Sequence, residues 1–422
     1  MSRSHQPSRR RFLQTAAAAS AVFAVPQFIP RRAFGANERI VTGHIGVGKQ
    51  GTGNLKKFAS NCAAVCDVDK KHVAAAASAL QGLGVKADTY GDYRKLLERK
   101  DIDAVVITTP DHWHALPTIH ACQAGKDVYV EKPLSLTVAE GRAMVEAARA
   151  NKRIVQTGSQ QRSDDRFRQA CEYVRSGRLG KIQTVLVGIP KVNHNGATVP
   201  DSAPPADLDY EMWLGPAPER PYNKNRSHYY FRFFWDYSGG QMTNFGAHHL
   251  DIAQWALGMD DSGPIAVEGD ATYHPMKWHE VTETCRLTYT YANGTKLILG
   301  QQQKDIPGGA TFIGEKGTIF VDRGKIVATP GEILASPLKD SDVQLYASKD
   351  HHKNFLDCIK SRELAICDVE IGHSSATVCH LGNIVARLGR KIQWDPVKER
   401  IIGDEDAAAM LSRPYRTPWK LA

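Results

Sequence analysis

The sequence predicts an α/β protein of two domains, in which a parallel sheet covered by helices precedes an α+β domain with a large, open, mainly antiparallel sheet. Three observations lead to this prediction. The chain has 422 residues, enough for two separate hydrophobic cores. Up to residue 159, short runs rich in valine and isoleucine alternate with stretches of helix-forming composition. From residue 160 onward the pattern changes to longer strand-like runs.

Five apolar runs predict the strands of the first domain. They are RIVTGHIGVG (39–48), NCAAVCDV (61–68), DAVVITT (103–109), DVYVEKP (127–133) and RIVQTGS (153–159). The composition between them predicts helices at 51–59, 70–80, 92–99, 112–124 and 137–150. Strands that alternate with helices in this way favour a parallel sheet covered on both faces.

Longer runs predict the antiparallel sheet of the second domain, which we assign to residues 160–422. They are KIQTVLVGI (181–189), IAVEGDATY (265–273), ETCRLTYTYANGTKLILGQQ (283–302) and GATFIGEKGTIFVD (309–322). The Asn293-Gly294 pair within the third run is typical of a hairpin turn. An irregular, proline-rich segment from residue 190 to 238 is too long to be a simple connection.

The net charge of +9 is concentrated at the N-terminus. Residues 1–35 hold six of the 54 basic residues and no Asp or Glu, so the remaining 48 basic residues face 45 acidic ones. No basic run follows this segment. The sequence therefore lacks the electrostatic surface on which nucleic-acid binding depends, and we expect no nucleic-acid partner.

Residues 1–35 predict an export signal. The stretch SRRRFLQ (8–14) precedes an alanine-rich apolar segment at 15–28, and Arg31 and Arg32 follow. Twin arginines before a moderately apolar segment are typical of a Tat signal, which exports proteins that have already folded. We therefore expect the Tat machinery as a partner, a periplasmic or otherwise exported protein, and no stable membrane insertion after processing. A disordered basic tail or an uncleaved anchor is the alternative.

A glycine-rich motif at the end of the first predicted strand indicates a dinucleotide site. Residues 46–51 read Gly46-Val47-Gly48-Lys49-Gln50-Gly51, a G-x-G-x-x-G motif that opens a predicted helix. Its glycines let the backbone approach a pyrophosphate at the helix N-terminus. Asp67 ends the next strand, where its carboxylate can accept a hydrogen bond from the ribose 2′-hydroxyl. A carboxylate repels a 2′-phosphate, so a Rossmann domain at 36–159 that binds NAD rather than NADP is predicted, although Lys70 and Lys71 follow closely.

Three further motifs identify a family. They are TTPDHWH (108–114), VEKPLSLT (130–137) and GGQMTNFGAHHLD (239–251). Together with GVGKQG (46–51), they resemble the Gfo/Idh/MocA oxidoreductases, named after glucose-fructose oxidoreductase, inositol dehydrogenase and rhizopine catabolism. The resemblance covers nearly the whole chain after the signal.

The resemblance implies a Rossmann domain and an open mixed sheet, with the substrate between them. It implies hydride transfer at a hydroxyl or carbonyl carbon of a sugar, cyclitol or sugar derivative. Lys132 is implied to lie beside the nicotinamide and the reacting hydroxyl. The implied cofactor pocket also contains Thr109, Pro110, Asp111, His114 and Glu131. The family further implies a homo-oligomer formed through the open face of the second sheet.

Residues 242–257 are predicted to form one helix that ends at Gly258. On such a helix Asn244, His248 and Asp251 share one stripe, which should face water or a ligand, and His249 points away. The family commonly has an aspartate at the position of Asn244. Because an amide cannot accept a proton, His248 becomes the expected general base and Lys132 its electrostatic partner. Asn244 is expected to orient a substrate hydroxyl or His248.

We expect no metal ion at this helix. The stretch His248-His249-Leu250-Asp251 lacks the i, i+4 histidine spacing of helical zinc sites, and adjacent histidines on a helix point apart.

The aromatic stretch HYYFRFFWDYSGG (228–240) suggests a sugar subsite. Aromatic rings beside polar groups suit the C–H face and the hydroxyl rim of a sugar. Arg232, Trp235 and Asp236 are the candidate substrate-binding residues beside His248. The same aromatic side chains could equally belong to the hydrophobic core.

Three functions remain open from the sequence. The first is an exported NAD-dependent oxidoreductase, whose cofactor would be tightly bound because it would cross the membrane with the folded protein. The second is an NAD-dependent glycoside hydrolase that uses transient oxidation followed by elimination. The third is a sugar-binding module without catalytic activity, which the amide at Asn244 would suit.

Overall fold

The computed structural model describes residues 39–194 and 196–421, so the predicted export signal lies outside the described residues. The architecture below belongs to the compact unit Val41–Ala422. Within the described ranges, none of the helices combines the length and the apolar character that a membrane crossing requires.

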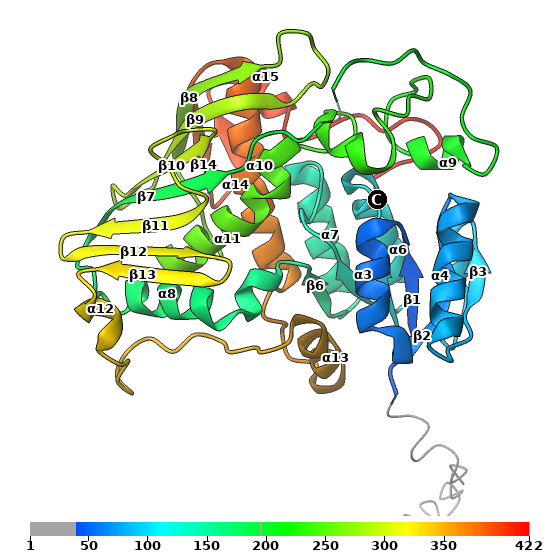
Figure 1. Cartoon of the computed structure of the whole chain (residues 1–422), viewed down its shortest axis with the longest axis horizontal. Helices are drawn as coiled ribbons and strands as arrows, with labels where there is room; N and C mark the ends of the chain where they lie inside the picture. Colours follow the sequence, from blue (N-terminus) through cyan, green and yellow to red (C-terminus); the bar gives the residue numbers. More distant parts are fainter. Residues whose placement is uncertain (1–38, 195, 422) are drawn as a thin grey trace, which may run out of the picture. The chain divides into compact units, whose positions relative to one another are not determined.

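The first sheet is parallel throughout and has the strand order β3-β2-β1-β4-β5-β6 (Figure 1). Its strands are β1 Thr42–Ile45, β2 Cys62–Cys66, β3 Asp88–Tyr90, β4 Ala104–Ile107, β5 Asp127–Val130 and β6 Val155–Thr157. The helices between them are α3 Lys49–Lys57, α4 Lys70–Gly82, α5 Tyr93–Leu97, α6 Ala115–Gln123 and α7 Val138–Ala150. The predicted α/β class is confirmed. In such sheets ligands bind outside the carboxyl ends of the strands, where the strand order reverses.

Strand β3 was not predicted, because it lies at the edge of the sheet and most of it is exposed. It has no apolar run that could have indicated it. The other strands of this sheet are buried, and each matches a predicted apolar run.

The second sheet has nine strands in the order β13-β12-β11-β7-β10-β9-β8-β14-β15. It is mainly antiparallel, as predicted, but β7 and β10 pair in parallel. Its strands are β7 Ile182–Ile189, β8 Ala266–Tyr273, β9 Thr282–Thr290, β10 Lys296–Gln301, β11 Gly309–Gly314, β12 Gly317–Asp322, β13 Lys325–Thr329, β14 Ile392–Asp395 and β15 Arg400–Ile402. The hairpin between β9 and β10 turns at Gly294, whose φ is +86°, as the Asn-Gly pair predicted.

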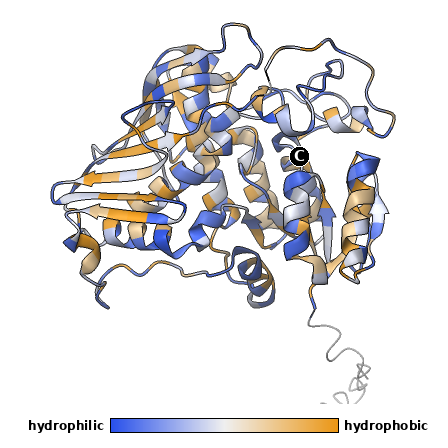
Figure 2. Cartoon of the chain, in the orientation of Figure 1, coloured by the Kyte–Doolittle hydropathy of each residue, from blue (hydrophilic) through white to orange (hydrophobic). Residues whose placement is uncertain are grey.

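Helices cover one face of the second sheet and share a hydrophobic core with it (Figures 1 and 2). The helices of this part are α8 Asp165–Arg175, α9 Tyr210–Leu214, α10 Gly240–Asn244, α11 Gly246–Leu257, α12 Glu332–Ala335, α13 His351–Ser361, α14 Val369–Leu388 and α15 Glu405–Ala409. Side chains of α8, α11 and α14 supply most of the helical part of that core. Helix α14 also packs against α7 and β6, so it joins the second sheet to the first.

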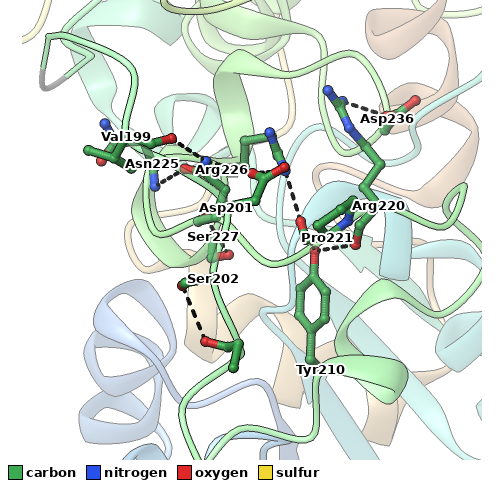
Figure 3. A network of polar contacts seen from close by, with 12 residues as sticks. Val199, Asp201, Ser202, Tyr210, Arg220, Pro221, Asn225, Arg226, Ser227 and Asp236 are labelled. Carbon is green, nitrogen blue, oxygen red and sulfur yellow. Dashed lines mark hydrogen bonds and ion pairs between the residues drawn. The ribbon is translucent and has the colours of Figure 1, made fainter.

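The irregular segment 190–238, here called the strap, is ordered by two kinds of contact. One is a cluster of buried aromatic side chains that includes Trp213, Phe233 and Tyr237. The other is a polar network in which Asp201 and Asp236 accept hydrogen bonds from arginines of the strap itself (Figure 3). The described part of the strap therefore has a defined conformation although it contains little regular structure.

The strap is attached to the loop between β2 and α4. The backbone N–H of Lys70 donates to the Asp207 carbonyl at 2.9 Å, and that of Asp209 donates to the Val68 carbonyl at 3.0 Å. The Lys71 amine lies 3.1 Å from the Asp207 carboxylate. Backbone and side-chain contacts thus hold the strap beside the end of β2.

Candidate functional site

A cavity of about 480 Å³ lies at the carboxyl ends of the first sheet and brings together residues of the first sheet and of the part of the chain after residue 160. That volume is in the range of ligand-binding cavities. The first domain contributes the glycine motif, Asp67 and the segments after β4 and β5. The second part of the chain contributes the 3₁₀ turn η4 (His228–Phe233), the ends of α10 and α11, and Arg323 after β12.

The glycine motif packs so closely that side chains would not fit at two of its positions. Gly46 has φ +82°, and a Cβ atom there would lie 2.7 Å from the Thr108 carbonyl carbon. A Cβ atom at Gly51 would lie 2.1 Å from the Gly46 carbonyl oxygen. Helix α3 begins at Lys49, directly after Gly48. The N-terminus of α3 therefore opens into the cavity with free N–H groups, where an anion such as a pyrophosphate binds favourably.

Asp67 follows β2 and lines the same cavity. One oxygen of its carboxylate accepts a hydrogen bond from the Val47 N–H at 2.8 Å, and the other accepts one from the Asp69 N–H at 2.9 Å. The His72 ring nitrogen Nδ1 lies 3.4 Å from the same carboxylate, and this contact raises the pKa of His72. The backbone thus fixes the carboxylate beside the glycine loop.

Glu131 and His114 are held in place by neighbouring loops. The Glu131 carboxylate accepts hydrogen bonds from Asn54 Nδ2 at 3.0 Å and from Gln50 Nε2 at 3.3 Å. The His114 ring lies between two carbonyl oxygens, at 2.7 Å from that of Pro133 and 3.0 Å from that of Thr109. These contacts tie the segments after β4 and β5 to the glycine loop.

Asp111 is a buried carboxyl at the same end of the cavity. It accepts a hydrogen bond of 2.5 Å from the Ser238 hydroxyl. Burial raises the pKa of Asp111, and the nearby His114 and Lys132 lower it in part.

Lys132, which follows β5, meets Asn244 at the end of α10. The Lys132 amine donates to the Asn244 side-chain oxygen at 2.9 Å and to the Asn244 carbonyl oxygen at 3.0 Å. Burial lowers the pKa of Lys132, and the charges of Arg232 and Arg323 lower it further, whereas Glu131 and Asp111 act in the opposite direction. The lysine is therefore an amine that can exchange a proton nearer to neutral pH than an ordinary lysine.

His248 lines the cavity beside this pair and is itself buried. Its Nδ1 atom is buried and has no hydrogen-bond partner among the described residues. Burial lowers the pKa of His248 well below its ordinary value, and the positive charges of Lys132 and Arg323 add to this effect. The imidazole is therefore neutral at neutral pH.

His249 points elsewhere, as expected for its position on the helix. Its Nδ1 atom lies 2.8 Å from the Gly188 carbonyl oxygen in β7, and the residue does not line the cavity.

The predicted single helix at 242–257 is wrong in detail. The segment forms two helices, α10 Gly240–Asn244 and α11 Gly246–Leu257, which are separated at Phe245, and Gly258 ends α11 with φ +71°. Asn244 and His248 reach the cavity, but Asp251 does not.

Asp251 is completely buried and forms an ion pair with Arg162, so the prediction that it faces water or a ligand is also wrong. The two side chains share hydrogen bonds of 2.8–3.0 Å, and Arg162 also pairs with Asp260. Arg162 lies 89 residues before Asp251, which is why the local pattern could not indicate this partner.

The aromatic stretch divides between the cavity and the protein interior. Arg232 lines the cavity, whereas Trp235 and Asp236 do not. Asp236 accepts a hydrogen bond from Arg220 at 2.7 Å, and the Trp235 ring lies 5.1 Å from the Arg387 guanidinium. These two side chains are thus occupied by structural contacts.

Several residues that line the cavity were not named as site residues. Trp113 belongs to the TTPDHWH motif, and His228, Tyr229 and Phe231 belong to the aromatic stretch 228–240. No local motif marks the others, among them His72, Met212, Trp213 and Arg323.

Family models match most of the chain. Residues 40–159 match the Gfo/Idh/MocA model described as "Oxidoreductase family, NAD-binding Rossmann fold". Residues 174–421 match its companion, "Oxidoreductase family, C-terminal alpha/beta domain".

Curated relatives include an inositol 2-dehydrogenase of Salmonella typhimurium, which is 33% identical over 186 residues. The match covers 41% of this chain and 53% of that protein, so the chain spans about half the length of this relative. A glycosyl hydrolase family 109 protein of Shewanella pealeana is 38% identical over 120 residues, or 26% of each chain. Among solved structures, the WlbA dehydrogenase of Bordetella pertussis, in complex with NADH and UDP-GlcNAcA, shares the fold. Its TM-score is 0.62 at 19% identity, over 85% of this chain and 99% of that chain.

Proposed function

The chain belongs to the Gfo/Idh/MocA oxidoreductase family, and from that premise we propose that it moves hydride between a nicotinamide cofactor and a hydroxyl or carbonyl carbon of a sugar, cyclitol or sugar derivative. The observation that carries this proposal is the contact between Lys132 and Asn244. It places an amine with a lowered pKa in a cavity that also contains the glycine motif.

The residues of the first domain fit a dinucleotide. The close packing at Gly46 and Gly51 leaves the start of α3 open to a pyrophosphate. Asp67 is positioned by two backbone N–H groups to accept from ribose hydroxyls. A carboxylate there favours NAD over NADP. Thr109, Pro110, Asp111, His114 and Glu131 line the cavity next to Lys132, and we assign them to the cofactor pocket.

Bound nicotinamide supplies the hydride acceptor or donor. During oxidation of a carbinol, the hydroxyl proton must go to a base as hydride leaves the carbon. We assign this base to Lys132. The ammonium that results keeps the Asn244 oxygens as acceptors and has the carboxylates of Glu131 and Asp111 nearby.

His248 suits a different role from the one that the sequence favoured. Burial, together with the nearby charges of Lys132 and Arg323, keeps the pKa of His248 well below its ordinary value, so the ring does not accept a proton near neutral pH. We therefore propose that neutral His248 makes a hydrogen bond to a substrate hydroxyl, with Asn244 holding Lys132 in position.

The strap supports a tightly bound cofactor. It is attached to the loop after β2 next to Asp67, and its residues His228 and Tyr229 line the cavity from the second part of the chain. We propose that the strap closes over the adenosine part of the cofactor. Purified protein should then keep stoichiometric nicotinamide cofactor through gel filtration, and complete loss of cofactor in the first passage would contradict this proposal.

A second candidate function is redox-assisted glycoside hydrolysis. The similarity to the family 109 hydrolase favours it, although that match covers 26% of each chain. In such a reaction the cofactor would be reduced and reoxidised within one turnover, and a strap-retained cofactor would suit that cycle.

One experiment separates these functions. The purified protein is incubated with a panel of free sugars, cyclitols and aryl glycosides, while reduced nicotinamide and phenol release are both followed. The oxidoreductase proposal predicts reduced cofactor with at least one free polyol. Phenol release without net cofactor reduction would overturn it in favour of the hydrolase, and neither signal would favour a sugar-binding module.

We also propose that residues 1–35 direct Tat export and that the cofactor travels bound to the folded protein. Arg10→Lys together with Arg11→Lys should then retain the protein in the cytoplasm, as measured by cell fractionation. Export of this variant at the normal level would contradict the proposal. Residues 36–159 would bind the cofactor and residues 160–422 the substrate.

We further propose a homo-oligomer that uses the open face of the second sheet. Val327 on β13 is 44% exposed and alternates with Ile326 and Ala328, which pack against the core shared with the helices, so its side chain is on the open face and suits a contact between two copies. Val327→Glu should lower the mass measured by light scattering, and an unchanged mass would contradict this interface.

A further inference from the structure

We propose that the substrate is an anionic carbohydrate, with a carboxylate or phosphate group that binds to Arg232 and is attracted by Arg323 at the rim of the cavity. This inference rests on the proposed oxidoreductase function and names the class of its substrate. Its support is Arg232 and Arg323, two cationic side chains that line the cavity and form no ion pair with a carboxylate of the described residues.

Arg232 is half-buried, and the described residues offer its guanidinium no ion pair. One of its terminal nitrogens, Nη1, donates to the Tyr229 carbonyl oxygen. Its guanidinium carbon lies 4.1 Å from the centre of the Tyr229 ring and 4.9 Å from that of Phe231. Two aromatic rings and one carbonyl thus hold the guanidinium, and none of these three groups carries a negative charge.

The other donors of Arg232 open into the cavity. A guanidinium carries five N–H donors. Among the described residues, each Arg232 nitrogen either has a hydrogen-bond partner or is accessible. Because Arg232 lines the cavity, its remaining donors are accessible from there. A planar fork of this kind matches a carboxylate or phosphate through two parallel hydrogen bonds.

Asp111 is the carboxyl whose charge acts on Arg232, but it is engaged by another side chain. Asp111 accepts the Ser238 hydroxyl at 2.5 Å, and burial raises the pKa of this carboxyl. Two other half-buried arginines, Arg142 and Arg220, are paired with Glu370 and Asp236, whereas half-buried Arg153 donates to two backbone carbonyls. Burial of an unpaired charge is costly, so an external anion is the natural partner of Arg232.

Arg323 adds a second positive charge at the substrate end. It follows β12, lies 5.5 Å from the centre of the Phe245 ring and donates to Gln161 at a long distance of 3.4 Å. Its charge lowers the pKa of both Lys132 and His248, which places it near the residues assigned to the reaction. The side chain is exposed, so it can attract an anion from solution.

The cofactor pyrophosphate is the competing anion. Its expected place is the start of α3, where the Lys49 amine lies 5.7 Å from the centre of the Tyr229 ring, the same ring that Arg232 contacts. Arg323 belongs to the end of the cavity formed by Phe245 and His248. The test must therefore measure cofactor affinity and substrate affinity separately.

The experiment compares matched substrates: an aldose, the corresponding uronic acid and the corresponding sugar phosphate. Wild-type holoenzyme should give a kcat/KM for one of the two anions at least 10-fold above that for the aldose. Arg232→Gln should lower the ratio of the anion's kcat/KM to that of the aldose by about 10- to 100-fold, mainly through KM. Arg232→Lys should recover part of this loss because it keeps the charge without the fork.

Two further arms complete the test. Added salt should raise KM for the anion in wild type, and Arg323→Gln should weaken this salt dependence. Arg286→Gln is the matched control, because Arg286 is an exposed arginine on β9 of the second sheet. It pairs with Asp305 outside the cavity. This variant should change neither the anion-to-aldose ratio of kcat/KM nor the salt dependence of KM.

The outcomes distinguish this inference from the proposed function. A wild type that prefers the neutral aldose would overturn the anionic substrate while the oxidoreductase function stands. So would an Arg232→Gln variant that loses affinity for NAD but keeps the anion-to-aldose ratio, since Arg232 would then serve the cofactor. Absence of hydride transfer with all three substrates would count against the proposed function itself.

Discussion

Lys132 is the residue on which the proposed chemistry depends, because its amine is the group assigned to the hydroxyl proton. Lys132→Met should lower kcat by about 10²- to 10⁴-fold, the usual contribution of a general base, and leave the dissociation constant of NAD within a few-fold. Lys296→Met, at an exposed position of β10, is the control and should keep full activity. A Lys132→Met variant with wild-type turnover would refute the assigned role.

The lowered pKa of Lys132 also predicts a pH profile. The amine accepts a proton only when it is deprotonated, so the rate of oxidation should rise with pH and reach half of its maximum below pH 10.5, the ordinary lysine value. Removal of a nearby cation raises the pKa of an amine, so Arg323→Gln should move the midpoint to higher pH. A midpoint that is unchanged or moves to lower pH would show that Lys132 does not control the profile.

At the level of elements, the start of α3 depends on the absence of a side chain at Gly51. The Cβ atom of Gly51→Ala would meet the Gly46 backbone oxygen at 2.1 Å, so the loop must move and cofactor affinity should fall at least 10-fold. Gly53→Ala is the matched control in the same helix, since nothing lies within 4 Å of its Cβ position. It should retain affinity and gain roughly 0.5–1 kcal/mol of stability. Equal affinities for the two variants would contradict the proposed pyrophosphate site.

The position of α11 depends on the buried ion pair between Arg162 and Asp251. Arg162→Leu leaves the Asp251 carboxylate buried without its cation, which should cost about 3–5 kcal/mol of unfolding free energy and lower the urea midpoint. Arg286→Leu removes an exposed pair with Asp305 and should cost less than about 1 kcal/mol. Similar costs for the two variants would mean that the buried pair does not stabilise the helix.

For the whole molecule, the sequence predicted those features that depend on residues close together in the chain, namely the buried strands and the dinucleotide motif. Apolar runs indicated the buried strands, and the spacing of Gly46, Gly51 and Asp67 placed a dinucleotide motif at their ends, where the structure forms a cavity. Contacts between distant segments were not predictable in this way. Arg162 and Arg323 carry no motif, and their positions depend on how the second sheet, α8 and α11 pack.

The division of the predicted helix at Phe245 also results from a contact between distant segments. A helical pattern continues through this residue in the sequence, but α10 ends where Asn244 turns its side chain and its carbonyl toward Lys132. The tertiary contact therefore overrides the local helical preference.

The most direct test of the central claim is to follow the hydrogen atom itself. A carbohydrate substrate from the panel is labelled with deuterium at the reacting carbon and incubated with the protein and oxidised NAD, and the reduced cofactor is analysed by mass spectrometry. Hydride transfer in this cavity predicts that the reduced nicotinamide carries the deuterium in wild type and that Lys132→Met forms almost none. Product that forms without deuterium in the nicotinamide would contradict the account.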